Sequence, residues 1–298
     1  MSNPATMNVE LDEQVRRYLV TGHHDPSLMG WPGSDFVDAS VQASVRLRDA
    51  LVNEVLAKAS SARRGPRLDA SRIRDLTRSK VTPMVTGLFP KAEHDQVLAT
   101  VERSVVFLTP ENIERVLRSE RWLHTIWSLA NLYLVSVRSE PLSEDAPVIV
   151  GLSQGTTCYV SMAYFKETDP CADFIVHEVA HIFHNCKRAT IGLPVSRRRE
   201  WLLDIDFRKR ELFAYACEAF SCILAAGDTH KRRIDALTQH ADGELPSDQT
   251  VAIEEYLDLL AEAVRSRNGW KTIEHHCAPM RQDGRTWPVR SSETRRSD

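Results

Sequence analysis

The chain has 298 residues, of which 42% are hydrophobic and 27% are charged. This balance is typical of a folded globular protein and excludes a largely disordered one. Its formal net charge of −3 gives no overall basic field that would attract nucleic acid or an acidic membrane surface. We therefore expect neither as a partner.

The first residues, Met1 to Thr6, lack the basic and then apolar segments of a secretory signal. No stretch approaches the roughly 20 apolar residues that a transmembrane helix needs. These features favour a cytoplasmic location. None of the six cysteines forms a CxxC pair, so we expect reduced thiols and no zinc ribbon. Three of them, Cys171, Cys186 and Cys217, are expected to be small core residues.

The sequence predicts an α+β fold that is predominantly helical. The N-terminal region, residues 1–105, has apolar residues at helical spacing, on a face that includes Val41 and Val45. Its expected helices cover residues 35–60, 70–80 and 92–105. This region has no chemical motif, and we interpret it as a packing or recognition module.

The next region, residues 106–270, combines helices with a small β-hairpin. Its expected helices cover residues 110–118, with Thr109 as N-cap, and residues 122–137, 211–225 and 247–267. The predicted hairpin has strands at 147–152 and 156–162, joined by 153–155. A further helix is expected to open at Asp169, with Pro170 in its first turn. Residues 271–298 are polar and predict a disordered tail.

Residues 177–181 read His-Glu-Val-Ala-His. On a helix, His177 and His181 share one face about one turn apart, so both imidazoles can bind one Zn²⁺. Glu178 lies beside that face and suits a general base that activates a water molecule. Apolar residues surround the motif, which indicates a buried helix.

A catalytic zinc needs a third protein ligand and an open position. The metzincin pattern requires a third histidine at the position of Lys187 and a glycine at that of His184, so it is excluded. A carboxylate from a later helix is the remaining choice. Four carboxylates are in range, namely Glu200, Asp204, Glu211 and Glu218. Glu211 is favoured because it begins an apolar helical stretch, whereas Glu200 follows three arginines.

The segment from Glu211 through Phe220 is similar to the glutamate helix of the lethal-factor type of zinc peptidase, in which a Glu-x-Phe-Ala segment supplies a ligand. With the HExxH motif, this resembles the gluzincins over about 50 residues, from 172 to 224. The resemblance implies that residues 106–270 form a zincin-like metallopeptidase domain. It also implies His177, His181 and Glu211 as Zn²⁺ ligands and Glu178 as the base.

A peptidase also needs a donor for the oxyanion of the tetrahedral intermediate. Tyr215, one turn after Glu211, is the candidate that we carry forward. The alternatives are Tyr159, Tyr164 and His184. Asp173 and Glu218 are candidates to orient the histidine rings, and the strand over 157–163 is a candidate edge for pairing with a substrate.

The hypothesis from the sequence is a zinc-dependent intracellular peptidase acting on a peptide or protein. The alternative is a catalytically silent zinc-binding module for regulation or protein interaction. The basic runs at 197–199 and 208–210 indicate a solvated surface, or else a rim that selects an acidic substrate segment. Neither the substrate nor the oligomeric state follows from the sequence.

Overall fold

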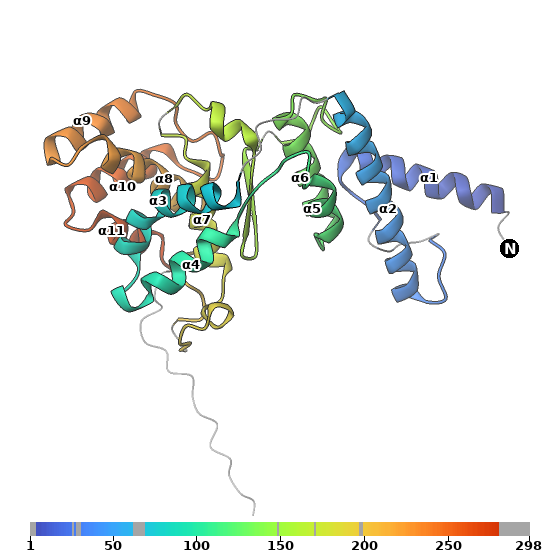
Figure 1. The fold of residues 1–298 in the computed structure, drawn as a ribbon, viewed down its shortest axis with the longest axis horizontal. Coiled ribbons are helices and arrows are strands. Elements are labelled where there is room, and N and C mark those ends of the chain that lie inside the picture. Colours follow the sequence, from blue (N-terminus) through green and yellow to red (C-terminus); the bar gives the residue numbers. More distant parts are fainter. Residues whose placement is uncertain are drawn as a thin grey trace, which may run out of the picture.

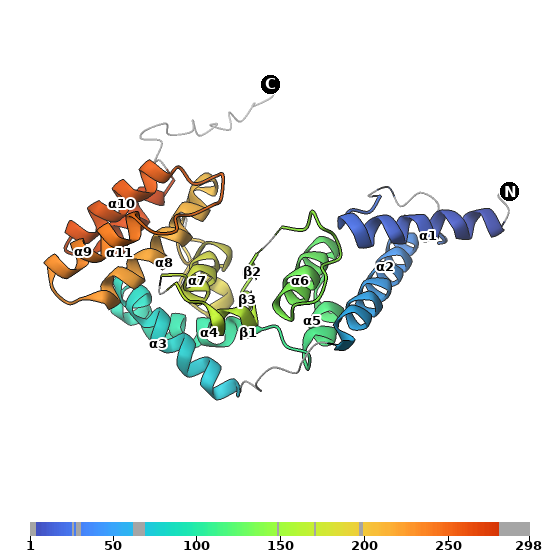
Figure 2. The same ribbon diagram turned by 90° about the horizontal axis from the view of Figure 1, so that it is seen from above.

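The structure, a computed structural model, describes residues 4–25, 27, 31–61, 69–147, 149–169, 171–196 and 199–279. This part of the chain is predominantly helical with a small three-stranded sheet, as expected. The helices form two groups, one on either side of the sheet (Figure 1, Figure 2). None of the described helices is long and apolar enough to cross a membrane.

In chain order, the helices of the first half are α1 (Pro4–Thr21), α2 (Phe36–Lys58), α3 (Ala70–Leu88), α4 (His94–Ser104), α5 (Ile113–Ser119) and α6 (Leu123–Ser136). The later helices are α7 (Phe174–Asn185), α8 (Arg210–Ala226), α9 (His230–Ala241), α10 (Ile253–Arg265) and α11 (Gly269–Cys277). The strands are β1 (Val105–Phe107), β2 (Gly151–Gln154) and β3 (Thr157–Val160).

The sheet has the order β1-β3-β2, with β3 parallel to β1 and antiparallel to β2. The strand that was expected to be an edge, β3, is therefore central, and β2 is an edge strand. The hairpin is shorter than predicted, because β2 begins only at Gly151 and β3 ends at Val160. Its turn is also tighter, because Ser153 and Gln154 pair with β3. The turn is made at Gly155, whose φ of 60° suits a residue without a side chain.

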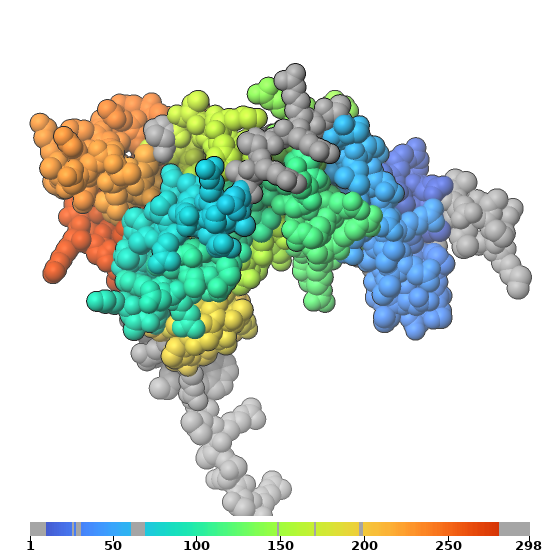
Figure 3. Space-filling view, in the orientation of Figure 1, coloured from blue at the N-terminus to red at the C-terminus, as the bar shows by residue number. Residues whose placement is uncertain are grey.

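Two hydrophobic cores lie on opposite faces of this sheet. The buried Cys158 and Val160 of β3 belong to the larger core, and Tyr159 between them belongs to the smaller one. This alternation follows from the two-residue period of a strand. Helices α1, α2, α5 and α6 build the smaller core, while α3, α4, α7, α8, α10 and α11 build the larger one. In Figure 3, α3 and α4 cover the larger core on the face shown.

The cores do not follow the predicted boundary at residue 105. Helices α3 and α4 come before that boundary, yet they pack in the larger core with α7 and α8. Helices α5 and α6 come after it and pack with α1 and α2. The apolar character of α6 around its whole circumference reflects this position, because α6 contacts α2 as well as β2.

The helix of the HExxH motif begins at a different residue from the one predicted. Asp173 is the N-cap of α7, and its side chain accepts a hydrogen bond from the Val176 N–H. Asp169 instead accepts a bond from the Cys171 N–H within the preceding loop. Pro170 lies outside the described residues. Both aspartates can cap a helix, so the sequence alone did not distinguish them.

Two further expectations need correction. The predicted tail begins too early, because residues 271–277 belong to α11 and Ile273 is fully buried. Residues 280–298 lie outside the described part. Cys171 and Cys222 form a disulfide that joins the loop before α7 to α8, whereas reduced thiols were expected. Cys186 and Cys217 are free and buried, as predicted for core residues.

Candidate metal centre

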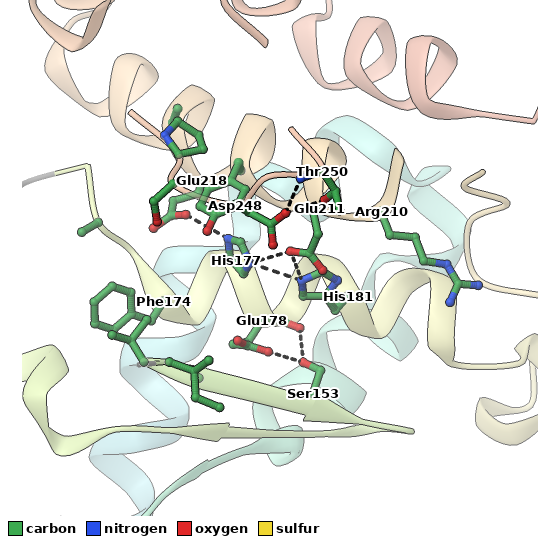
Figure 4. A pocket seen from close by; sticks show the side chains of 18 of the residues that line it. Ser153, Phe174, His177, Glu178, His181, Arg210, Glu211, Glu218, Asp248 and Thr250 are labelled. Atoms are coloured by element: carbon green, nitrogen blue, oxygen red, sulfur yellow. Dashed lines mark hydrogen bonds and ion pairs between the residues drawn. The ribbon is translucent and has the colours of Figure 1, made fainter. Parts of the chain in front are cut away.

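Helix α7 brings the two histidines of the motif together. The His177 and His181 Nε2 atoms are 3.2 Å apart, as expected for two rings one helical turn apart. The opposite face of α7 is buried in the larger core, with Ile175, Val179 and Ile182 fully buried. This packing fixes the rotation of α7 about its axis and directs both imidazoles into the cavity between α7 and α8 (Figure 4).

Helix α8 supplies a carboxylate to the same point. Glu211 Oε2 lies 3.7 Å from the His177 Nε2 atom and 3.5 Å from that of His181. Glu211 stands in the first turn of α8, which is held by the buried Leu212, Phe213 and Ala214 that follow it. Among the described residues, these three form the cluster that could hold a metal ion.

The separations of the three ligand atoms fit a tetrahedral metal site. Ligand atoms placed about 2.1 Å from a tetrahedral Zn²⁺ are about 3.4 Å from one another. The observed separations are 3.2, 3.5 and 3.7 Å. Two imidazoles and one carboxylate also form a donor set of catalytic zinc, with a fourth position left for water. The residues present therefore fit the ion.

Each imidazole ring also has a polar partner at its Nδ1 atom. His177 Nδ1 lies 3.0 Å from Glu218 Oε2, so the ring can donate its Nδ1 proton there and leave Nε2 free for a metal. Glu218 is 8% exposed and lies two turns after Glu211 on α8. His181 Nδ1 lies 3.0 Å from His184 Nε2. Burial and the charges of His181 and Arg210 lower the pKa of His184 to about 3, so its ring is neutral.

The electrostatics of the triad favour a cation. Burial would lower the pKa of His177, but hydrogen bonds to Glu211 and Glu218 raise it to about 10. Burial opposes ionisation of Glu211, yet its hydrogen bonds to His177 and His181 hold its pKa well below the usual range. The carboxylates thus stabilise positive charge at this point, and a bound metal ion benefits from the same field.

Glu178 is buried between α7 and strand β2. The Ser153 hydroxyl donates to Glu178 Oε2 over 2.6 Å and lies 2.9 Å from the Glu178 carbonyl oxygen. Gly151 makes room for this side chain, because a Cβ there would lie 2.6 Å from Glu178 Cγ. Burial raises the pKa of Glu178. Neither Gly151 nor Ser153 carries a sequence signal for this contact, because the pattern predicts only a strand end and a turn there.

Tyr215 lies at the triad. Its ring meets that of His177 edge to face, with centroids 4.5 Å apart, and it lines the cavity. Burial raises the pKa of Tyr215 to about 12, so its hydroxyl keeps its proton at neutral pH. Of the other tyrosines considered, Tyr159 lies in the smaller core and bonds to Glu120. Tyr164 packs in the larger core, and neither lines the cavity.

The other candidate carboxylates lie elsewhere. Glu200 pairs with Lys187 at 2.7 Å on the surface, and neither it nor the exposed Asp204 lines the cavity. Asp173, considered as a partner of the histidine rings, instead caps α7 and pairs with Lys80 at 2.8 Å.

The triad opens onto a cavity of about 1130 Å³, lined by β2, α7, the start of α8 and the loop over 244–250. Comparison of the chain with protein-family models, curated proteins and solved structures finds no match. The geometry of this centre is therefore the basis on which a function can be assigned.

Proposed function

We propose that this chain is a zinc-dependent peptidase with a zincin-like domain. The observation that carries the proposal is the triangle of His177 Nε2, His181 Nε2 and Glu211 Oε2, with sides of 3.2, 3.5 and 3.7 Å. The HExxH sequence and the similarity of α8 to the glutamate helix of the lethal-factor type of peptidase support it. When bound, Zn²⁺ supplies a Lewis acid at this corner of the cavity.

Glu178 acts as the general base. Its carboxyl group lines the cavity beside the triad, and its raised pKa brings it closer to the range in which a base works at neutral pH. In the proposed reaction, Glu178 accepts a proton from the attacking water and passes it to the leaving amine. Ser153 holds the carboxyl group throughout.

Tyr215 is the proposed donor to the oxyanion. Its protonated hydroxyl is carried by the same helix as Glu211, and its ring contacts His177. Such a donor stabilises the charge that develops on the carbonyl oxygen of the scissile bond. Strand β2 borders the cavity as an edge strand, so an extended peptide can pair with its free side.

The test combines metal content with cleavage. The zinc-loaded protein is incubated with a proteome-derived peptide library, and new termini are identified by mass spectrometry. We expect cleavage that a chelator abolishes and added Zn²⁺ restores. The Glu178→Gln variant should retain the metal and lose at least about a hundredfold in rate, as expected for removal of a general base.

A matched control is Glu200→Gln, which removes a surface carboxylate outside the cavity. It should cleave at the wild-type rate. Cleavage by Glu178→Gln at the wild-type rate would contradict the mechanism. A zinc-loaded wild-type protein that cleaves nothing in the library would instead favour the catalytically silent zinc-binding module.

A further inference from the structure

One end of the cavity carries an arginine pair on the segment that leads into α8. Phe207, Arg208 and Arg210 all line the cavity, next to Asn185 and His184 of α7. Arg210 extends from the start of α8 beyond His181, at the opposite end of the pocket from Phe174 (Figure 4). Arg210 therefore lies on the His181 side of the metal triad, and Arg208 stands two residues before it, in the turn that precedes α8.

Neither guanidinium group has an acidic partner among the residues that the structure describes. Lys209, which stands between them in the sequence, is already paired with Glu255 at 2.9 Å, and it donates to the His276 carbonyl. Arg210 Nε is buried and has no hydrogen-bond partner. By contrast, the buried Arg188 is paired with Glu93. A buried N–H without a partner is costly unless a ligand completes it.

The guanidinium group of Arg210 contacts an aromatic ring. The guanidinium carbon lies 5.2 Å from the centroid of the Phe207 ring, which is the range of a cation–π contact. Phe207 is 79% exposed, the highest value among the large hydrophobic residues described. An exposed ring that supports an unpaired arginine at the mouth of a cavity offers a flat, positively charged surface to a ligand.

The rest of the cavity wall has the opposite charge. Outside the triad, Glu218 and the proposed base Glu178, its acidic residues are Glu167, Asp169, Glu244 and Asp248. Asp248 lies near His177 and Glu218, away from Arg210 (Figure 4). A substrate group with negative charge is repelled from that wall and attracted to the arginines, so the cavity has an electrical polarity along its length.

We infer that Arg208 and Arg210 form a carboxylate subsite that selects peptides with a negative group on the His181 side of the scissile bond. This inference rests on the proposed peptidase function. The guanidinium groups bind the carboxylate through charge-assisted hydrogen bonds, for which arginine has a suitable fork of donors. The carboxylate is provided by an aspartate or glutamate side chain, or by the C-terminus of the peptide.

The cleavage library tests the subsite directly. Cleaved peptides should share an acidic residue, or a free C-terminus, at one fixed distance from the cut. Arg208→Gln and Arg210→Gln should each lower kcat/KM for these peptides by about tenfold, or about 1.4 kcal/mol. The effect should shrink at high salt, because Arg208 is exposed. Lys209→Gln is the matched control and should keep the preference.

A charge-reversal variant distinguishes loss of the subsite from poor folding. Arg208→Glu should shift the preference at that position from acidic to basic residues, which a destabilised protein would not do. Wild-type cleavage without any preference for a carboxylate would overturn the subsite and leave the peptidase proposal intact. An unchanged preference in both glutamine variants would overturn it as well.

A binding measurement separates failure of the subsite from failure of the peptidase. Fluorescein-labelled hexa-alanine amide is compared by fluorescence anisotropy with versions that carry central glutamates, central glutamines or a free C-terminus. The zinc-loaded Glu178→Gln protein should bind a carboxylate version about tenfold more tightly than the neutral ones, and Arg210→Gln should remove the difference. Equal binding of all four peptides would overturn the subsite even if no peptide is ever cleaved.

Discussion

The Ser153 hydroxyl lies 2.6 Å from Glu178 Oε2, so strand β2 holds the side chain of the proposed base. The contact joins the edge of the sheet to the helix that carries both histidines. Gly151, two residues earlier on the same face of β2, leaves the space that the carboxyl group occupies. The sheet therefore contributes to the geometry of the proposed reaction as well as to the cavity wall.

Ser153→Ala should lower kcat by about ten- to a hundredfold, which corresponds to the loss of one hydrogen bond to a charged group. KM and metal content should stay near the wild-type values, because Ser153 contacts none of the three metal-site side chains directly. Steady-state kinetics on a library-derived peptide provide the measurement. Ser153→Thr keeps the hydroxyl group and should recover most of the rate. Equal loss in both variants would show that the hydroxyl is unimportant.

Glu218→Ala should weaken zinc affinity by about 10- to 100-fold, as loss of a carboxylate that orients a ligating histidine does. The reason is that His177 Nδ1 would lose its partner at 3.0 Å. Competition with a fluorescent zinc chelator measures the effect. Glu218→Gln retains an oxygen acceptor and should show a smaller loss. Wild-type affinity in the alanine variant would contradict this assignment.

Glu93→Gln should lower the free energy of unfolding by about 3 kcal/mol, because it leaves Arg188 buried without its carboxylate. The Arg188 side chain is 2% exposed and lies 2.7 Å from Glu93. Chemical denaturation at pH 7 measures the change. Glu114→Gln, which breaks an exposed pair with Arg118, is the control and should leave the free energy of unfolding nearly unchanged, because solvent screens an exposed ion pair.

The difference between wild type and Glu93→Gln should also depend on pH. Burial would raise the pKa of Glu93, but the hydrogen bond to Arg188 and the charge of Arg199 lower it overall. The pair therefore stabilises the fold fully above the unfolded-state pKa of about 4.3, and this contribution is lost as the pH falls through the lower folded-state value. A difference that grows on acidification would contradict the assignment.

Replacing Cys171 and Cys222 together by alanine should destabilise the protein by about 4 kcal/mol, since the disulfide closes a loop with a sequence separation of 51. Thermal unfolding with and without a reductant provides the measurement. The reductant should lower the Tm of the wild type and leave that of the double variant unchanged. A reductant that leaves the Tm of the wild type unchanged would argue against the bond.

The parts of the fold predicted well are those with long periodic patterns. Helix α8 was expected over 211–225 and spans 210–226, because its apolar residues continue over several turns. Strand β1 was missed, since three residues are too few to show a strand period. Val41 and Val45 were expected on an apolar face, yet they are 57% and 51% exposed. Ala39 and Ala43 lie on the buried face of α2 instead. Which face of this helix is buried depends on the helices that pack against it, so its own sequence does not determine it.

The candidate site also contains residues that the sequence predicts and residues that it does not. His177, Glu178 and His181 follow from local spacing on one helix, and Glu211 follows from the apolar helix that carries it. The partners that hold these groups, Ser153 and His184, come from a strand end and from the next helical turn. Neither pattern has a chemical signature in a sequence, because hydroxyl and imidazole groups are common on surfaces.

The proposed function requires that His177, His181 and Glu211 together hold one Zn²⁺ ion. Crystals of the zinc-loaded protein, measured above and below the zinc absorption edge, locate the ion and its ligands. We predict one anomalous peak about 2.1 Å from both Nε2 atoms and from a Glu211 carboxylate oxygen. A protein without such a peak, or a peak bound by Glu218 in place of Glu211, would contradict the account.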